Sequence, residues 1–175
     1  MMKPKFFIGP MSKNIVDAVI EFSNEEKVSI GLIPSRRQIE YTSGYVNNWS
    51  TKEFSEYVRR YTENILLVRD HGGPGQGSID DDGYTSIEED CKYFDILHID
   101  PWKKLQDIEK GSDETIKMIE FCHSLNPKIK FEIGTEESIR KFETSELLYF
   151  IEKLKNRLSP STFEQIQYLV IQSGT

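Results

Sequence analysis

ILLVRDHGGPGQG, residues 65–77, is the stretch that decides the fold. Its first four residues form an uninterrupted apolar run, which is typical of a strand buried within a sheet. Arg69, Asp70 and His71 follow, so the strand delivers a guanidinium, an acid and an imidazole to its carboxyl end. Four glycines and a proline come next, and glycine-rich backbone can approach a phosphate or sugar closely. The stretch therefore predicts a buried strand that leads into a functional loop.

Similar apolar runs recur along the chain and alternate with helical patterns. We expect strands over 6–8, 28–33, 65–68, 95–99, 128–133 and 165–171. Helices are expected over 13–25, 50–64, 86–94, 112–125 and 144–157. Ser50 followed by Glu53 is the sequence pattern of a capping box. Strands and helices in regular alternation predict a parallel sheet covered by helices.

Two α/β architectures fit this alternation: an open doubly wound sheet and a TIM (β/α)8 barrel. Open sheets concentrate function at one switch point, whereas barrels draw it from the ends of many strands. Polar groups follow every expected strand from the second onward, namely Ser35-Arg36-Arg37, Asp70-His71, His98 with Asp100, Glu132 with Thr135-Glu136, and Gln172-Ser173. This spread favours the barrel.

The chain is short for a complete barrel. A barrel of this type needs about 250 residues, and this chain has 175. We therefore expect one domain over residues 1–175 with about six strand–helix units, truncated after the sixth strand. Because an open sheet exposes unpaired edges, we also expect a homo-oligomer.

Composition excludes several classes of protein. The net charge is -7 with the acidic residues spread out, which does not favour nucleic-acid binding. No run of about 18 apolar residues is present, so no membrane span is expected. The two cysteines, Cys91 and Cys122, lack metal-ligand spacing and are better explained as reduced thiols of a cytoplasmic protein.

Asp70 and His71 are the strongest candidates for chemistry, as an acid/base carboxylate beside a metal-binding imidazole. The alternative is a loop-capping aspartate and a histidine bonded to a backbone carbonyl. His98 and Asp100 alternate on one strand, so both side chains point to the same face. They either bind a ligand there, His98 as a metal ligand, or form a buried pair that organises the core.

The remaining candidates lie at other strand ends. Glu132 is predicted to be catalytic or to support a metal, and an internal ion pair is the alternative. The arginine forks of Arg36 and Arg37 suit phosphate, unless they form a solvated basic patch. The residues expected to bind substrate are Arg36, Arg37, Gly72, Gly73, Asp100, Gln172 and Ser173.

The order of these motifs resembles a known family. The residues that carry the resemblance are Glu40-Tyr41-Thr42-Ser43, Asp70-His71-Gly72-Gly73-Pro74, Leu97-His98-Ile99-Asp100 and Glu132-Ile133-Gly134-Thr135-Glu136. In this order they are similar to the tagatose-bisphosphate aldolase accessory (GatZ/KbaZ-type) subunits. That group is related to the class II, metal-dependent fructose/tagatose-bisphosphate aldolases.

The resemblance implies a barrel that acts on phosphorylated sugars with a divalent metal, zinc. It implies that Asp70 exchanges a proton with the substrate, that His71 binds the metal and that Glu132 supports or binds it. Class II aldolases use further histidines from later strands, so the isolated chain is expected to show little aldol cleavage. Three functions stay open: a metal-dependent lyase, a non-catalytic subunit that stabilises a partner aldolase, and a sugar-phosphate isomerase or epimerase.

Overall fold

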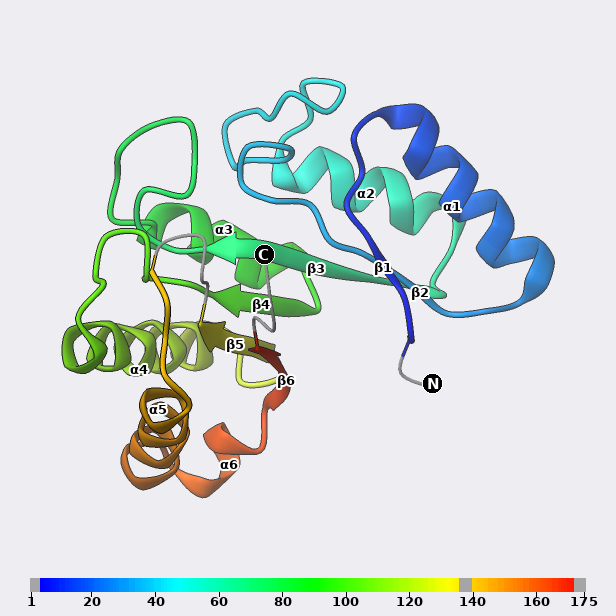
Figure 1. Ribbon diagram of the computed structural model, residues 1–175. Coiled ribbons are helices and arrows are strands. Elements are labelled where there is room, and N and C mark those ends of the chain that lie inside the picture. The colour runs from blue at the N-terminus through cyan, green and yellow to red at the C-terminus, as the bar shows by residue number, and fades with distance from the viewer. Residues whose placement is uncertain (1–3, 136–139, 172–175) are drawn as a thin grey trace.

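A parallel sheet forms the centre of the computed structural model, which describes residues 4–135 and 140–171. Within these residues six strands pair in the order of the sequence, β1 to β6, and each neighbouring pair is parallel. The strands are β1 Phe7–Ile8, β2 Ile30–Leu32, β3 Ile65–Gly72, β4 Ile96–Ile99, β5 Lys130–Thr135 and β6 Ile166–Ile171. The strands and helices alternate along the chain (Figure 1).

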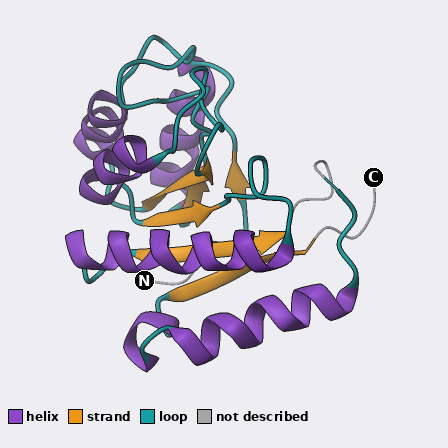
Figure 2. Ribbon diagram, turned by 90° about the vertical axis from the view of Figure 1, so that its left-hand side faces the viewer, coloured by secondary structure: helices purple, strands orange, loops and turns teal. Residues whose placement is uncertain are grey.

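The helices lie along the outer side of the sheet, as Figure 2 shows. They are α1 Lys13–Glu26, α2 Thr51–Tyr61, α3 Tyr84–Tyr93, α4 Ile108–Leu125, α5 Thr144–Arg157 and α6 Pro160–Phe163. The capping box expected at the start of α2 is confirmed, because Ser50 and Glu53 each bond the other's backbone N–H. In the described part of the chain, no helix combines the length and the apolar character that crossing a bilayer requires.

Opposite faces of the strands have different surroundings. Side chains on the outer face pack under the helices, and Leu67, Leu97 and Phe131 are each 0% exposed. The inner face is concave, because the ring of Phe7 on β1 contacts that of Tyr168 on β6, with ring centroids 5.3 Å apart. The sheet is thus a half-barrel, which confirms the predicted incomplete TIM-type fold.

Several element boundaries differ from the sequence prediction, and helix α6 was not expected. Helix α4 begins at Ile108 with Asp107 as its cap, rather than at Ser112. The Ser112 hydroxyl instead bonds the Ile108 carbonyl inside the helix. Strand β3 continues past Val68 to Gly72, so the predicted loop residues 69–72 belong to the strand.

Arg69 lies on the outer face of β3 and does not reach the site that its sequence position suggested. It is 0% exposed and forms a two-pronged ion pair with Asp90 of α3, at 2.7 and 2.8 Å. Its Nη1 also donates to the carbonyls of Pro34 and Ile39 in the loop after β2. One buried guanidinium therefore joins a strand, a helix and a loop.

Breaking this ion pair should destabilise the fold. Asp90→Ala leaves the Arg69 charge buried without its partner, and we expect a loss of about 3–5 kcal/mol in the free energy of unfolding. Urea denaturation measures it. Lys92→Ala on the same helix is the matched control, since that side chain is 53% exposed and pairs at the surface. It should cost at most about 1 kcal/mol, and equal losses in the two variants would contradict the assignment.

Candidate functional site

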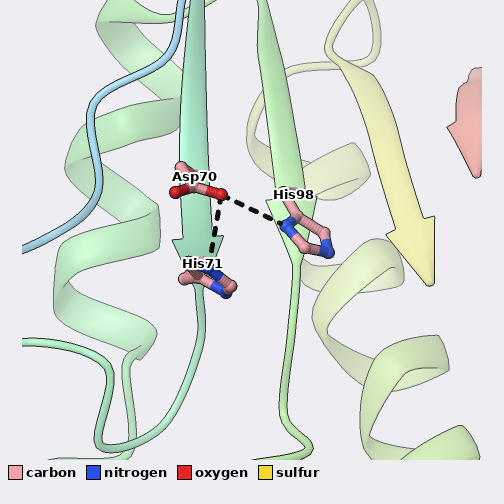
Figure 3. A group of neighbouring side chains, drawn as sticks. All are labelled: Asp70, His71 and His98. Atoms are coloured by element: carbon pink, nitrogen blue, oxygen red, sulfur yellow. Dashed lines mark ion pairs between the residues drawn. The ribbon is translucent and has the colours of Figure 1, made fainter. Parts of the chain in front are cut away.

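Asp70, His71 and His98 meet at the carboxyl ends of β3 and β4 (Figure 3). Oδ1 of Asp70 lies 3.6 Å from Nε2 of His71 and 3.7 Å from Nδ1 of His98. These distances exceed those of ordinary hydrogen bonds. One ligand atom from each residue lies within 4.8 Å of the other two. The sequence prediction that these three residues share a site is consistent with this geometry.

An irregularity in β3 brings the two consecutive residues to the same place. Successive side chains of a regular strand point to opposite faces. The pairing of β3 with β4 shifts register between Arg69 and Gly72, and His71 has a φ of 49°, in the left-handed region. Such a bulge re-aims a side chain, and backbone strain of this kind is concentrated at functional sites. The sequence prediction did not include it.

Gly72 and Gly73 are explained by close packing of the backbone. A Cβ on Gly72 would lie 2.8 Å from the His98 carbonyl oxygen, and one on Gly73 would lie 2.3 Å from that of Asp100. The Asp100 N–H also donates to the Gly72 carbonyl at 2.8 Å. Only glycine permits β4 to come this close. That these glycines also bind substrate stays a prediction.

Arg36 has structural contacts that the sequence did not indicate. Its guanidinium is buried, 1% exposed, and donates to Glu40, to Asp81 and to the Gly73 carbonyl. These contacts tie the loop after β2 to the loop after β3, and the expectation that Arg36 binds substrate stays a prediction. Arg37 is exposed, and its predicted substrate contact stays a prediction. Gln172 and Ser173 lie outside the described residues.

Asp100 supports the ring of His71, and its predicted substrate contact stays a prediction. Its side chain is 0% exposed, and its Oδ2 lies 2.7 Å from Nδ1 of the His71 ring. Gln76, which the sequence prediction missed, donates from Nε2 to the same oxygen at 2.8 Å. No local pattern could have indicated this contact, because 24 positions separate the two residues.

Glu132 lies one strand further along the same face. Glu132 is on β5, where it is in register with His98 of β4 on one side and with Tyr168 of β6 on the other. Its side chain is half-buried. Its negative charge acts on His98, but it is outside the three-residue cluster. The expected catalytic or metal-supporting role of Glu132 stays a prediction.

The charged groups of the cluster shift the pKa values of Asp70 and His98. Burial tends to raise the pKa of Asp70, but the interaction with His98 and the charge of His71 outweigh it and lower that pKa. Burial likewise tends to lower the pKa of His98, and the attraction of Asp70, Asp100 and Glu132 raises it instead. The Asp70 carboxylate is therefore ionised at neutral pH and acts as an acceptor.

The residues of the cluster fit a divalent metal. With bonds of about 2.0–2.1 Å and a tetrahedral angle, two ligand atoms of one zinc ion lie about 3.4 Å apart. The separations of 3.6 and 3.7 Å around Asp70 are close to this value. Nε2 of His98 is buried and has no hydrogen-bond partner within residues 4–135 and 140–171. Because Nδ1, not Nε2, is the ring atom near Asp70, this orphaned nitrogen lies on the other side of the His98 ring from the three-residue cluster.

Comparison with known proteins supports the fold. No protein-family model and no curated protein matches this chain. Among solved structures, a probable tagatose 6-phosphate kinase from Sinorhizobium meliloti is 16% identical with a TM-score of 0.72, over 93% of this chain and 45% of that chain. A fructose-bisphosphate aldolase from Campylobacter jejuni is 11% identical with a TM-score of 0.65, over 94% of this chain and 51% of that one.

The chain has an aldolase-like fold. Identities of 11% and 16% carry the comparison no further than the fold. The chain spans about half the length of these two structures.

The strain at His71 is open to direct measurement. His71→Gly and His71→Ala both remove the ring, but only glycine adopts a positive φ without cost. We therefore expect the glycine variant to be more stable than the alanine variant by about 1 kcal/mol in urea denaturation with a chelator present.

The matched control is the same pair of substitutions at Asp70, which is not among the residues with positive φ. At Asp70 we expect the opposite result, with the glycine variant less stable than the alanine variant by about 0.5–1 kcal/mol. The same order at both positions would contradict the strain at His71.

Proposed function

We propose that this protein is a class II aldolase-like protein of sugar-phosphate metabolism that binds a divalent metal, zinc, through His71 and His98. The observation that carries the proposal is the convergence of two imidazoles and one ionised carboxylate at the carboxyl ends of adjacent barrel strands. Enzymes with TIM-type barrels place their active sites at this end of the strands.

The chemistry proposed for the site divides between metal and protein. When bound, the metal polarises a substrate carbonyl as a Lewis acid. Asp70 is about one-third exposed, at 32%, so its carboxylate is reachable by substrate. Being ionised, it would accept the proton of the substrate hydroxyl as that oxygen becomes a carbonyl, and then give it to the enediolate carbon that keeps the electron pair of the broken carbon–carbon bond. Asp100 holds the His71 ring beside Asp70 throughout.

Phosphorylated sugars are the proposed substrate class. The two similar structures are named for a tagatose 6-phosphate kinase and a fructose-bisphosphate aldolase, so both names contain a phosphorylated sugar. Arg37 is exposed in the loop after β2, where its fork of donors suits a phosphate. The free, buried thiols of Cys91 and Cys122 suit the reducing cytoplasm.

One observation favours the second candidate, a non-catalytic subunit that stabilises a partner aldolase. The chain has three histidines, and the third, His123, lies in the last turn of α4 in the helical layer. The cluster therefore receives two imidazoles from the described residues. Two imidazoles and one carboxylate are enough to hold an ion, which is all that the supporting role requires, alone or in an oligomer with the partner.

Zinc binding tests the proposal. We expect the metal-free protein to bind one zinc ion per chain, measured by competition with a chromophoric chelator. His71→Ala should weaken the affinity by more than about 100-fold, because losing a ligand costs more than losing an outer partner. His123→Ala is the matched control and should leave the affinity unchanged. No zinc binding by the unmodified protein would overturn the proposal.

Turnover then separates the two candidates. With zinc added, aldol cleavage of fructose 1,6-bisphosphate and tagatose 1,6-bisphosphate is measured with the unmodified protein and with Asp70→Asn. We expect little cleavage by the protein alone. Cleavage that Asp70→Asn abolishes would establish the lyase and exclude the accessory role. Zinc binding without cleavage, followed by activation or stabilisation of an added aldolase, would establish the accessory subunit.

A further inference from the structure

Asp100 has a complete set of hydrogen bonds although it is fully buried. Its Oδ2 faces Nδ1 of His71 at 2.7 Å and accepts from Nε2 of Gln76 at 2.8 Å. Its Oδ1 accepts from the backbone N–H of Trp102 at 3.2 Å. Its own N–H donates to the Gly72 carbonyl. The carboxylate is therefore held rigidly between the ends of β3 and β4.

The orientation of the Gln76 amide follows from its two partners. Nε2 lies 2.8 Å from Oδ2 of Asp100 and 3.3 Å from the carbonyl oxygen of the same residue. Both atoms are acceptors, so the amide nitrogen, not the amide oxygen, must face them. Because Oδ2 already accepts from Gln76, it acts as an acceptor toward His71 as well. The proton of this contact is therefore on Nδ1 of His71.

Placing the proton on Nδ1 decides what the other side of the ring does. In a neutral imidazole one nitrogen donates and the other accepts. Nε2 of His71 then presents its lone pair 3.6 Å from Oδ1 of Asp70. In the neutral ring this nitrogen and Oδ1 of Asp70 are both acceptors, the arrangement that a shared cation would bridge. The tautomer that Asp100 selects is the one that a metal at Asp70 requires.

Gln76 connects this pair to the glycine loop, residues 73–83. The loop is tied down at several points: Arg36 binds the Gly73 carbonyl and Asp81, and Lys103 donates to the Gly75 carbonyl. Gly75 has a φ of 68°, which places Gln76 over the end of β4. The loop conformation thus sets where the Gln76 amide lies.

We propose that Gln76 is a positioning residue that acts through Asp100 to hold the His71 ring with Nδ1 protonated and Nε2 turned toward Asp70. The effect of Gln76 on metal affinity rests on the proposed function. Its effect on the tautomer of the His71 ring does not. Outer-shell partners of this kind change metal affinity by about 10–100-fold. Gln76 therefore links the loop that covers the site to the strength with which the site holds its ion.

The test compares Gln76→Leu with the unmodified protein, in two measurements. Leucine has a similar size and no donor, and Gln76 is half-buried, so equal urea midpoints are required first. The ¹⁵N shifts of the imidazole nitrogens, assigned with His71→Ala, report the tautomer in the metal-free protein. We expect the Nδ1-protonated form of His71 in the unmodified protein and a mixture of tautomers in Gln76→Leu. Zinc affinity should fall by about 10-fold.

Two further variants make the result specific. Asp100→Asn removes the carboxylate but keeps the shape, and should disturb the His71 tautomer more than Gln76→Leu does. Gln106→Leu is the matched control, an exposed glutamine in the loop after β4, and should change neither measurement.

The outcomes separate this inference from the proposed function. Unchanged His71 shifts in Gln76→Leu and in Asp100→Asn overturn the inference, even if the protein binds zinc. Altered shifts in a protein that binds no zinc support the positioning role and overturn the proposed function. Altered shifts together with a 10-fold loss of zinc affinity support both.

Discussion

The irregular end of β3 is the constraint on which the site depends. A regular strand would send Asp70 and His71 to opposite faces, one inside the half-barrel and one under the helices. The register shift after Arg69 and the positive φ of His71 place both beside His98 instead. The two glycines that follow let the backbone of β4 approach closely enough to complete the arrangement. Backbone geometry, more than residue type, thus creates the cluster.

Polar side chains serve two separate purposes on the two sides of the sheet. On the outer side, Arg69 is neutralised by Asp90 and satisfied by loop carbonyls, which organises the fold. At the loops, Arg36 does the same between Glu40 and Asp81. On the inner side Asp70 faces the imidazoles of His71 and His98 at distances too long for ordinary hydrogen bonds. Buried polar groups that a protein leaves partly unsatisfied are those available to a ligand.

The sequence predicted what depends on neighbouring residues and missed what depends on distant ones. The alternation of strands and helices and the capping box of α2 follow from local pattern. The ion pair of Arg36 with Asp81 could not be predicted, because the two residues lie 45 positions apart in the sequence. Ser112 was mistaken for the cap of α4 because Asp107 has the same chemistry one turn earlier. The bulge at His71 left no signal, since histidine is not a residue that normally adopts a positive φ.

The electrostatics of the site point to a cation whatever its chemical role. The carboxylates of Asp70, Asp100 and Glu132 all act to raise the pKa of His98. The same negative charge that draws a proton to an imidazole also draws a metal, and the two compete for the same nitrogens. A divalent ion has the advantage in such a site, because one ion balances two carboxylates and occupies both imidazoles at once. Catalysis then requires in addition an open position for substrate beside Asp70, whereas a supporting subunit needs only the ion and the rigid strand ends around it.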